Sequence, residues 1–371
     1  MEIIYGRENL EEVLKVVNSA FCAVREDGFD FRYIMPKAYG KDCNLLQYHY
    51  VIKDNGKNVA AAGNIPNVIK TSAGEYKFSF LGSVATLPDC QGKGYMRTLM
   101  NRVERDDLNN GVVFSLLTGA RGRYCRYGYT KCFSSVVYTF DEYFLSHTES
   151  DSDISVSPLS AKDLDDAFEI YRSNSPLVFR DKNNFVPSLE FSLSKARVIH
   201  KNGNLIGYYC FTTRKSLGVG ELAIVDTAHL KAVLKAIGDF ENVKSFNVNA
   251  NPLDVRMTRA LDALCECAAL SDGLHIKVYD MARFVQMLLA LNIEKGIKRI
   301  GNVQETISIG GDCFEVYVND GKASVLKTNK KPQFVFESAE FLRLAINGTS
   351  RAMDESKIFP LAFGISAPDE F

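Results

Sequence analysis

The residues best suited to chemistry lie between Val84 and Met96, where a strand-like run passes through a glycine-bearing turn directly into a helix. The first backbone N–H groups of a helix have no partners within it, and together with the helix dipole they attract an anion. Gly92 and Gly94 would let the backbone approach a pyrophosphate closely, and Lys93 would add a positive charge. The pattern therefore indicates a phosphate-binding turn, although a plain left-handed turn before a surface helix has the same composition.

Two familiar phosphate-binding motifs do not fit this spacing. A P-loop needs Ser or Thr directly after its lysine, but Gly94 follows Lys93. A dinucleotide-binding fingerprint needs a glycine three positions after its second glycine, and Arg97 stands at that place. Neither motif therefore explains the turn.

The segments around the turn alternate between strand-like and helical patterns. Apolar residues recur at helical spacing from Tyr95 to Leu108, and short strand-like runs precede and follow this helix. Asn55-Gly56 predicts a tight hairpin, because these residues tolerate the positive φ that such turns need. A similar strand, Asn-Gly turn and strand recur around residues 202–203, but no glycine-rich turn follows the strand-like run Glu221–Asp226. If this is an internal duplication, the second copy has lost the anion-binding element.

The turn resembles the Gln/Arg-x-x-Gly-x-Gly/Ala signature of the GNAT acetyltransferases, with Gln91 and Gly94 in place and Met96 at the last small position. Downstream, Arg123–Tyr129 resembles the Tyr-x-Arg-Phe-Gly-Tyr segment of one GNAT subfamily, the enhanced-intracellular-survival (Eis-like) N-acetyltransferases. The similarity covers the whole chain and includes its last residues, Glu370-Phe371. We therefore interpret the sequence as similar to the Eis-like family.

This resemblance implies an α+β fold (mixed α/β) with three domains. A catalytic GNAT domain is expected over residues 1–148 and a degenerate second GNAT-like domain over 149–272, both built on central mixed sheets. A sterol-carrier-like α+β domain is expected over 273–371, with its C-terminus returning to the active site. The polar, Ser/Asp-rich stretch at 148–153 has the composition of a linker between the first two.

The resemblance also implies acetyl-CoA as co-substrate, without a metal, and assigns residues to it. Backbone groups of the strand before the turn would pair with the pantetheine arm, namely Ser83, Val84 and Thr86. The turn and the first helical residues would hold the pyrophosphate, namely Gln91, Gly92, Lys93, Gly94, Tyr95 and Met96.

Two catalytic roles follow from the same resemblance. Tyr124 would be the general acid, because a phenol with a pKa of about 10 can donate a proton to a thiolate whose conjugate acid has a pKa near 8.5. The alternative is that Tyr124 only packs, as we expect of Tyr127 and Tyr129. The base would be the terminal carboxylate of Phe371, against the alternative that residues 366–371 are a frayed tail.

The cationic amines that the family acetylates imply acidic groups beside the acceptor. Glu370 matches a substrate-binding glutamate of the family, and Phe21 matches a substrate-binding phenylalanine. The family has a second acid two positions after that phenylalanine, but Ala23 stands there, and Glu26 is a nearby, unmatched candidate. This departure leaves open whether the chain shares the family's substrate range.

Composition narrows the class of protein further. The 44 Lys and Arg residues balance 45 Asp and Glu residues, so the chain lacks the basic excess expected of a nucleic-acid-binding or anionic-membrane-binding protein. No apolar run reaches the roughly 18–20 residues that span a bilayer, and the start does not have the pattern of a secretory signal. The nine cysteines are scattered without a CxxC pair, which favours free thiols in the cytoplasm over disulfides or a zinc site.

These observations predict an acetyl-CoA-dependent N-acetyltransferase that acts on a primary amine of a cationic small molecule (aminoglycoside-like or polyamine) or on a lysine. The resemblance implies a homo-oligomer, commonly a hexamer. The alternative is a non-catalytic CoA- or lipid-binding protein with a vestigial GNAT domain. The intact turn at residues 91–94 and the presence of Tyr124 favour the enzyme.

Overall fold

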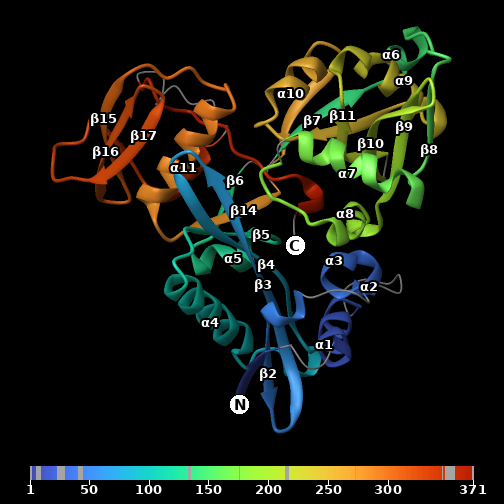
Figure 1. Ribbon diagram of the computed structural model, residues 1–371. Coiled ribbons are helices and arrows are strands. Elements are labelled where there is room, and N and C mark those ends of the chain that lie inside the picture. Colours follow the sequence, from blue (N-terminus) through green and yellow to red (C-terminus); the bar gives the residue numbers. More distant parts are fainter. Residues whose placement is uncertain are drawn as a thin grey trace.

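The computed structural model contains three β-sheets, each accompanied by helices, arranged around a central junction (Figure 1). It describes residues 2–5, 10–22, 30–40, 45–132, 135–174, 176–213, 217–271, 273–344, 346 and 356–369. The predicted mixed fold with central mixed sheets is confirmed. No helix in these described ranges is both long enough and apolar enough to cross a bilayer.

The first sheet has seven strands in the order β1-β2-β3-β4-β5-β14-β6, of which only β4 and β5 pair in parallel. Helix α1 and helix α4 pack on this sheet from opposite sides (Figure 1). The strands are β1 (Glu2–Tyr5), β2 (His49–Asp54), β3 (Lys57–Thr71), β4 (Gly74–Thr86), β5 (Phe114–Thr118), β6 (Thr130–Cys132) and β14 (Leu274–Val278). The helices are α1 (Leu10–Cys22), α2 (Phe31–Ile34), α3 (Pro36–Tyr39), α4 (Tyr95–Asn109) and α5 (Arg121–Tyr124).

The second sheet also has seven strands, in the order β13-β7-β12-β11-β10-β9-β8. Its two faces bury separate apolar clusters, one beneath α7 and α8 and the other beneath α6, α9 and α10. The strands are β7 (Ser135–Phe140), β8 (Ile154–Pro158), β9 (Lys195–Lys201), β10 (Asn204–Thr212), β11 (Gly218–Ile224), β12 (Phe246–Ala250) and β13 (Cys267–Ser271). The helices are α6 (Glu142–His147), α7 (Leu164–Ser173), α8 (Lys182–Leu189), α9 (Leu230–Phe240) and α10 (Val255–Asp262).

The third sheet is smaller, with four strands in the order β17-β16-β15-β18. Helix α11 packs against β17, and α12 follows β18. These elements are α11 (Met281–Glu294), β15 (Val303–Ile309), β16 (Asp312–Asn319), β17 (Lys322–Lys327), β18 (Phe334–Phe336) and α12 (Ser338–Leu344). β15, β16 and β17 form an antiparallel meander with turns at residues 310–311 and 319–321.

The two predicted Asn-Gly hairpins form as the sequence indicates. Asn55 and Gly56 have φ values of 49° and 80° between β2 and β3, and Asn202 and Gly203 have values of 50° and 78° between β9 and β10. Two successive residues with positive φ are the mark of a type I′ turn, whose twist suits a two-residue hairpin. The helix expected to follow the glycine turn also forms, as α4.

Two strands join sheets other than those to which the expected domain boundaries would assign them. β7 lies in the second sheet between β13 and β12, although it precedes residue 149. β14 lies in the first sheet between β5 and β6, although it follows residue 272. Sheet membership therefore crosses the domain boundaries expected from the sequence, and those boundaries stay a prediction.

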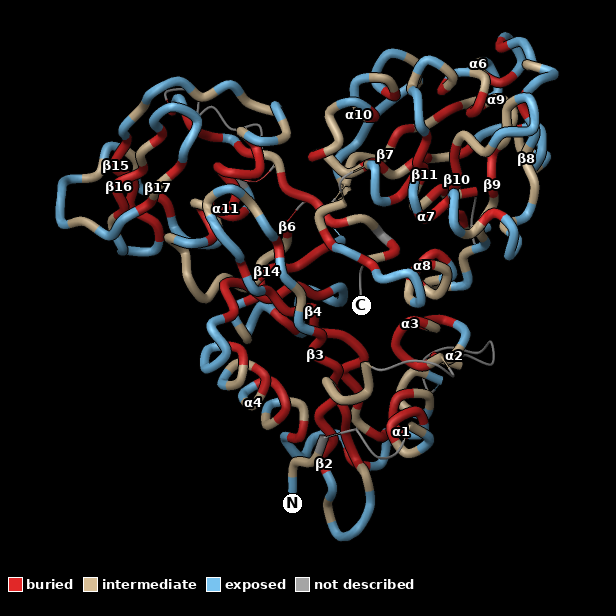
Figure 2. The backbone as a smooth tube through the Cα atoms, viewed as in Figure 1, coloured by how far each residue is buried: buried red, intermediate tan, exposed pale blue. Residues whose placement is uncertain are grey.

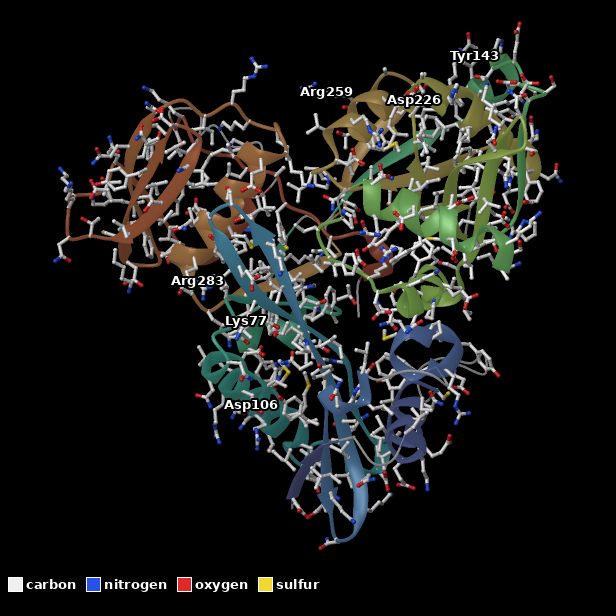
Figure 3. All side chains as sticks on the ribbon, viewed as in Figure 1. Lys77, Asp106, Tyr143, Asp226, Arg259 and Arg283 are labelled. Atoms are coloured by element: carbon white, nitrogen blue, oxygen red, sulfur yellow. The ribbon has the colours of Figure 1, made fainter. Side chains whose placement is uncertain are left out.

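The third part of the chain shares its core with the first. Phe114 of β5 lies 5.2 Å from Phe284 of α11 and 5.9 Å from Phe363, measured between ring centroids. Arg283 of α11 donates a hydrogen bond to the backbone oxygen of Glu75 on β4, near Lys77 at the same junction (Figure 3). Beneath this exposed contact, buried apolar residues of β4, β5 and α11 belong to one core, and buried segments meet at the junction of the two parts (Figure 2).

A buried histidine makes the first sheet sensitive to acid. His49 on β2 places Nδ1 3.1 Å from the backbone oxygen of Leu45, so Nδ1 carries the hydrogen and Nε2 accepts from the Tyr39 hydroxyl at 2.9 Å. Burial lowers the pKa of His49 to about 4. The unfolded chain therefore takes up a proton near the ordinary histidine pKa, while the folded chain does so only at a lower pH.

We therefore expect stability to be lost as the pH falls from the ordinary histidine pKa towards that of buried His49. Between pH 6.5 and pH 5, the free energy of unfolding of the wild type should fall by about 1.5 kcal/mol more than that of His49→Gln. Urea unfolding at both pH values measures this difference. His147→Gln, at an exposed histidine, serves as the control and should follow the wild type. Parallel losses in wild type and His49→Gln would contradict the assignment.

Candidate acyl-CoA site

The glycine turn leads into α4 with its backbone open to the outside. Gly92 and Gly94 have φ values of 79° and 83°, in the left-handed region that favours glycine. Gly94 is the N-cap residue of α4 and supplies no side-chain cap, so the first N–H groups of the helix keep their binding capacity. A Cβ at either glycine would have no atom within 4 Å, which leaves room for a ligand.

Tyr95 anchors the start of α4 to the sheet. Its hydroxyl donates a 2.7 Å hydrogen bond to Oδ2 of Asp54, the last residue of β2. This hydrogen bond, supported by burial, raises the pKa of Tyr95 to about 12. The tyrosine therefore stays protonated, and its hydrogen bond ties the N-terminus of α4 to the end of β2.

Strands β4 and β5 separate just before the turn. Their last parallel pair is Leu81 with Leu117, and on the other side of β4 the pairing with β3 shifts register beyond Gly82. Ser83 has a φ of 52° at this shift, which is the geometry of a β-bulge. The β4 backbone from Val84 to Thr86 therefore has a neighbouring strand on one side and an open split on the other.

The split and the turn meet in one cavity of about 420 Å³. It brings together most of the residues that the sequence predicted for the cofactor, together with the predicted acceptor residue Phe21. The cavity is lined by Ala20, Phe21, Val84, Ala85, Thr86, Cys90, Gln91, Gly92, Lys93, Gly94, Tyr95, Met96, Arg97, Arg123, Arg126 and Tyr127. Ser83, by contrast, does not line it and is buried at the bulge.

Comparison with known proteins identifies the family of the domain that contains this site. Residues 5–132 match the sequence profile of the acetyltransferase (GNAT) domain. These residues form a GNAT N-acetyltransferase domain. The match spans β1 to β6 and includes the glycine turn, the strand split and the cavity, so the predicted enzyme class is confirmed.

Solved structures show that the chain shares its fold with other proteins over nearly its whole length. Eis1 from Mycobacterium abscessus superimposes with a TM-score of 0.66 at 15% identity, covering all of both chains. A GCN5-related N-acetyltransferase from Anabaena variabilis gives 0.66 at 15% identity over 93% of this chain and 89% of that one. A probable N-acyltransferase from Enterococcus faecalis gives 0.66 at 15%, over 98% and 99%. At this identity the likeness establishes a shared fold, and no curated protein matches the sequence significantly.

Tyr124 lies at the end of α5, next to the cavity of the GNAT domain but not on its lining. Its ring is buried against Gly119, where an added Cβ would come within 2.6 Å of Cε2, and it meets Tyr129 edge to face. Burial raises the pKa of Tyr124, which keeps its hydroxyl protonated near neutral pH. This state suits a proton donor, and the assignment of Tyr124 as general acid stays a prediction.

Three arginines of the cavity were not among the predicted site residues. Arg97 lies in the first turn of α4, while Arg123 and Arg126 lie on either side of Tyr124 in the chain. Together with Lys93 they give the lining, as far as the structure describes it, four cationic side chains and no acidic one. Their place in the sequence was the signal that could have identified them, because a phosphate-bearing ligand needs positive charge: Arg97 directly follows the first motif, and Arg123 and Arg126 lie within the second.

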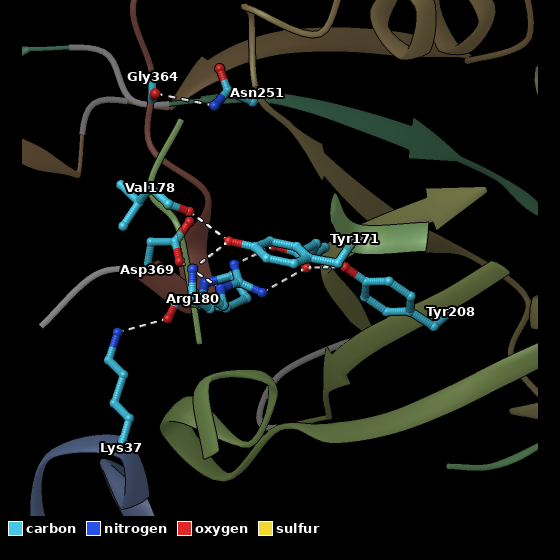
Figure 4. A network of polar contacts seen from close by, with 10 residues as sticks. Lys37, Tyr171, Val178, Arg180, Tyr208, Asn251, Gly364 and Asp369 are labelled. Carbon is cyan, nitrogen blue, oxygen red and sulfur yellow. Dashed lines mark hydrogen bonds and ion pairs between the residues drawn. The ribbon is translucent and has the colours of Figure 1, made fainter. Parts of the chain in front are cut away.

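The remaining predicted site residues lie outside the described part of the chain, namely Glu26, Glu370 and Phe371. The described chain continues to Asp369, whose side chain accepts a 2.6 Å hydrogen bond from Nε of Arg180 (Figure 4). Lys37 of α3 donates a 2.7 Å hydrogen bond to the backbone oxygen of Pro368. The C-terminal segment therefore lies between the GNAT domain and the second sheet.

The second sheet lacks the anion-binding turn of the GNAT domain. After β11 the chain enters a short 3-10 helix (Thr227–His229), and Asp226 accepts a hydrogen bond from the backbone N–H of Ala228. A carboxylate thus occupies a helix-terminal donor that a phosphate would need, and its negative charge would repel one. A larger cavity of about 1150 Å³ lies here and shares no lining residue with the cofactor cavity. Among the described residues, no group of three or more His, Cys, Asp or Glu could hold a metal ion.

A substitution at the turn tests the cavity as the acyl-CoA site. Gly94→Ala should weaken acetyl-CoA binding about 5- to 30-fold, because a left-handed alanine costs about 1–2 kcal/mol and the turn must be forced into that conformation on binding. Isothermal titration calorimetry measures the dissociation constant. Gly122→Ala is the matched control, since Gly122 has ordinary φ and open space around its Cα. Equal affinity in the two variants would rule out the turn as the binding element.

Proposed function

We propose that the chain transfers the acetyl group of acetyl-CoA to a primary amine of a cationic small molecule or of a lysine. The observation that carries the proposal is the single cavity in which the open edge of β4 meets the N-terminus of α4. An extended pantetheine arm can pair with a strand edge at Val84 and Thr86, and a pyrophosphate can bind the turn from Gln91 to Met96. The buried bulge residue Ser83 would hold the edge in place.

The transfer needs a free amine, a thioester and a donor for the leaving group. The amine nitrogen attacks the thioester carbonyl carbon, the C–S bond breaks, and the thiolate of CoA takes a proton from the Tyr124 hydroxyl. The proton lost by the amine passes to a base, which we propose is the terminal carboxylate of Phe371. Positioning of amine and thioester side by side supplies much of the rate enhancement, so a weak base suffices.

For the acceptor, we propose a cationic amine bound beside Phe21, which lines the cavity next to the turn. Glu26 and Glu370 would supply the negative charge that holds it. Arg97, Arg123 and Arg126 in the cavity lining suit the phosphates of CoA and repel an ammonium group. We therefore propose that the ammonium group of the acceptor lies near the two glutamates and away from these arginines. By resemblance to the Eis-like family, we also propose that the chain assembles as a homo-oligomer, commonly a hexamer.

The decisive experiment is mass-spectrometric detection of acetylated product. The untagged protein is incubated with acetyl-CoA and a panel of aminoglycosides, polyamines and lysine peptides. Product identifies the acceptor class. Acetyl-CoA binding without any product would favour the non-catalytic alternative, and absence of acetyl-CoA binding would refute the proposal.

Tyr124→Phe tests the general acid. The variant keeps the edge-to-face contact with Tyr129 but removes the donor, so kcat should fall about 100-fold with little change in KM for acetyl-CoA. Tyr127→Phe is the matched control, because Tyr127 lines the cavity without an assigned proton transfer. Steady-state kinetics with an accepted amine give both values. Equal kcat in Tyr124→Phe and wild type would show that Tyr124 only packs.

Extension of the chain by one alanine after Phe371 tests the base. The extension removes the Phe371 carboxylate and displaces the terminal charge by one residue, so kcat should fall about 100-fold while acetyl-CoA affinity is kept. One alanine added at the N-terminus is the control. Retained kcat in the C-terminally extended chain would contradict this role of Phe371.

A further inference from the structure

In each of the two large sheets, two parallel strands separate from each other in the same way. In the GNAT domain β4 leaves β5 after Leu81, and a register shift with β3 follows at once. In the second sheet β11 leaves β12 after Val219, and a register shift with β10 follows between Cys210 and Phe211. Each split thus begins where a parallel pair ends beside a bulge, so that β11 in the second sheet corresponds to β4 in the first.

The second split borders the larger cavity, which the C-terminal segment lines with Ile365 and Ser366, and side chains of the protein itself bind β11 beside it. Glu221 follows the bulge, and its carboxylate accepts hydrogen bonds from Arg180 Nη1 at 2.9 Å, Arg180 Nη2 at 2.6 Å and the Tyr208 hydroxyl at 2.8 Å. At the end of β11, Arg256 donates to the backbone oxygens of Ile224 and Val225. In the second sheet, arginines therefore contact the strand that borders the split, at the Glu221 side chain and at the backbone oxygens of Ile224 and Val225.

Arg180 is the centre of this arrangement (Figure 4). Its side chain is 3% exposed, and its guanidinium lies 4.8 Å from the centre of the Tyr171 ring. While Nη1 and Nη2 hold Glu221, Nε donates to Asp369 Oδ1 at 2.6 Å. A planar guanidinium that binds two buried carboxylates has a fixed orientation, because a rotation that improves one contact breaks the other.

Two further contacts hold the same C-terminal segment, both at residues that precede Asp369. Asn251, just after β12, donates to the backbone oxygen of Gly364 at 3.1 Å. Lys37 of the GNAT domain donates to the backbone oxygen of Pro368 at 2.7 Å. The segment from Gly364 to Asp369 is therefore held by the part of the chain around the second sheet and by α3 of the GNAT domain, and Arg180 supplies the ion pair with Asp369.

We propose that the second GNAT-like sheet uses its strand split to hold the C-terminal segment instead of a cofactor, with Arg180 as a positioning residue for the acetyl transfer. Through Asp369, Arg180 would set where the Phe371 carboxylate meets the acceptor amine, and in this respect the inference rests on the proposed function. The holding of residues 364–369 by Arg180 can be tested independently of catalysis.

Asp369→Asn tests whether Arg180 holds the C-terminal segment without disturbing the second sheet, because this variant leaves the Arg180–Glu221 pair intact. Arg180→Gln removes the whole contact. Arg172→Gln is the matched control, since it makes the same change at an exposed arginine of α7. Hydrogen–deuterium exchange of peptides covering residues 361–369 reports the holding, and steady-state kinetics report the transfer.

In both Asp369→Asn and Arg180→Gln we expect faster exchange at residues 361–369 and a kcat lower by about 100-fold, because a displacement of about 1 Å can cost that much. KM for acetyl-CoA should stay within about twofold of wild type, which a general loss of fold would not allow. Arg172→Gln should match wild type in every respect.

Each contrary result has its own meaning. Unchanged exchange in Asp369→Asn and Arg180→Gln would overturn the holding. Faster exchange with unchanged kcat would overturn the positioning role. If the wild type binds acetyl-CoA but acetylates no amine, the proposed function fails, and the exchange result alone decides whether Arg180 holds the segment.

Discussion

The structure depends above all on the separation of two parallel strands at a bulge. Parallel neighbours share an evenly spaced hydrogen-bond ladder, and β4 and β5 keep it only as far as Leu81 and Leu117. Beyond this point one edge of β4 has backbone groups without a neighbouring strand, which in a buried strand would be costly. The separation is stable because the edge borders a cavity, and the start of α4, anchored by Tyr95 on Asp54, closes the far end of that cavity.

Residues far along the chain support this separation. β14 pairs with β5 from Leu274 opposite Thr118 to Val278 opposite Phe114, so β5 has a partner on the side away from β4. Phe284 and Phe363 then pack on Phe114 from the third part of the chain. The GNAT domain consequently does not have a complete sheet or core within residues 1–148, and its cavity relies on the C-terminal part for rigidity.

Local features of this fold were predictable from the sequence, and features that pair distant residues were not. The Asn-Gly hairpins, helix α4 and the glycine turn each depend on a few adjacent residues whose φ preferences and apolar spacing are visible in the sequence. The exchange of β7 and β14 between sheets has no such signal, because both strands carry ordinary apolar runs that would suit either sheet. Arg180 and Asp369 stand 189 positions apart, and neither belongs to a motif.

The two splits share a backbone geometry but differ in the chemical groups beside them. Both β4 and β11 leave a parallel neighbour beside a bulge, yet only the first leads into glycines with positive φ. In the second, Asp226 binds an amide that a phosphate would need, and Glu221 places a carboxylate in the split. A buried carboxylate requires a cation, and Arg180 satisfies it with capacity for a second carboxylate. The second split is thus suited to a cationic side chain and not to a phosphate, and Arg180 connects it to Asp369 near the end of the described chain.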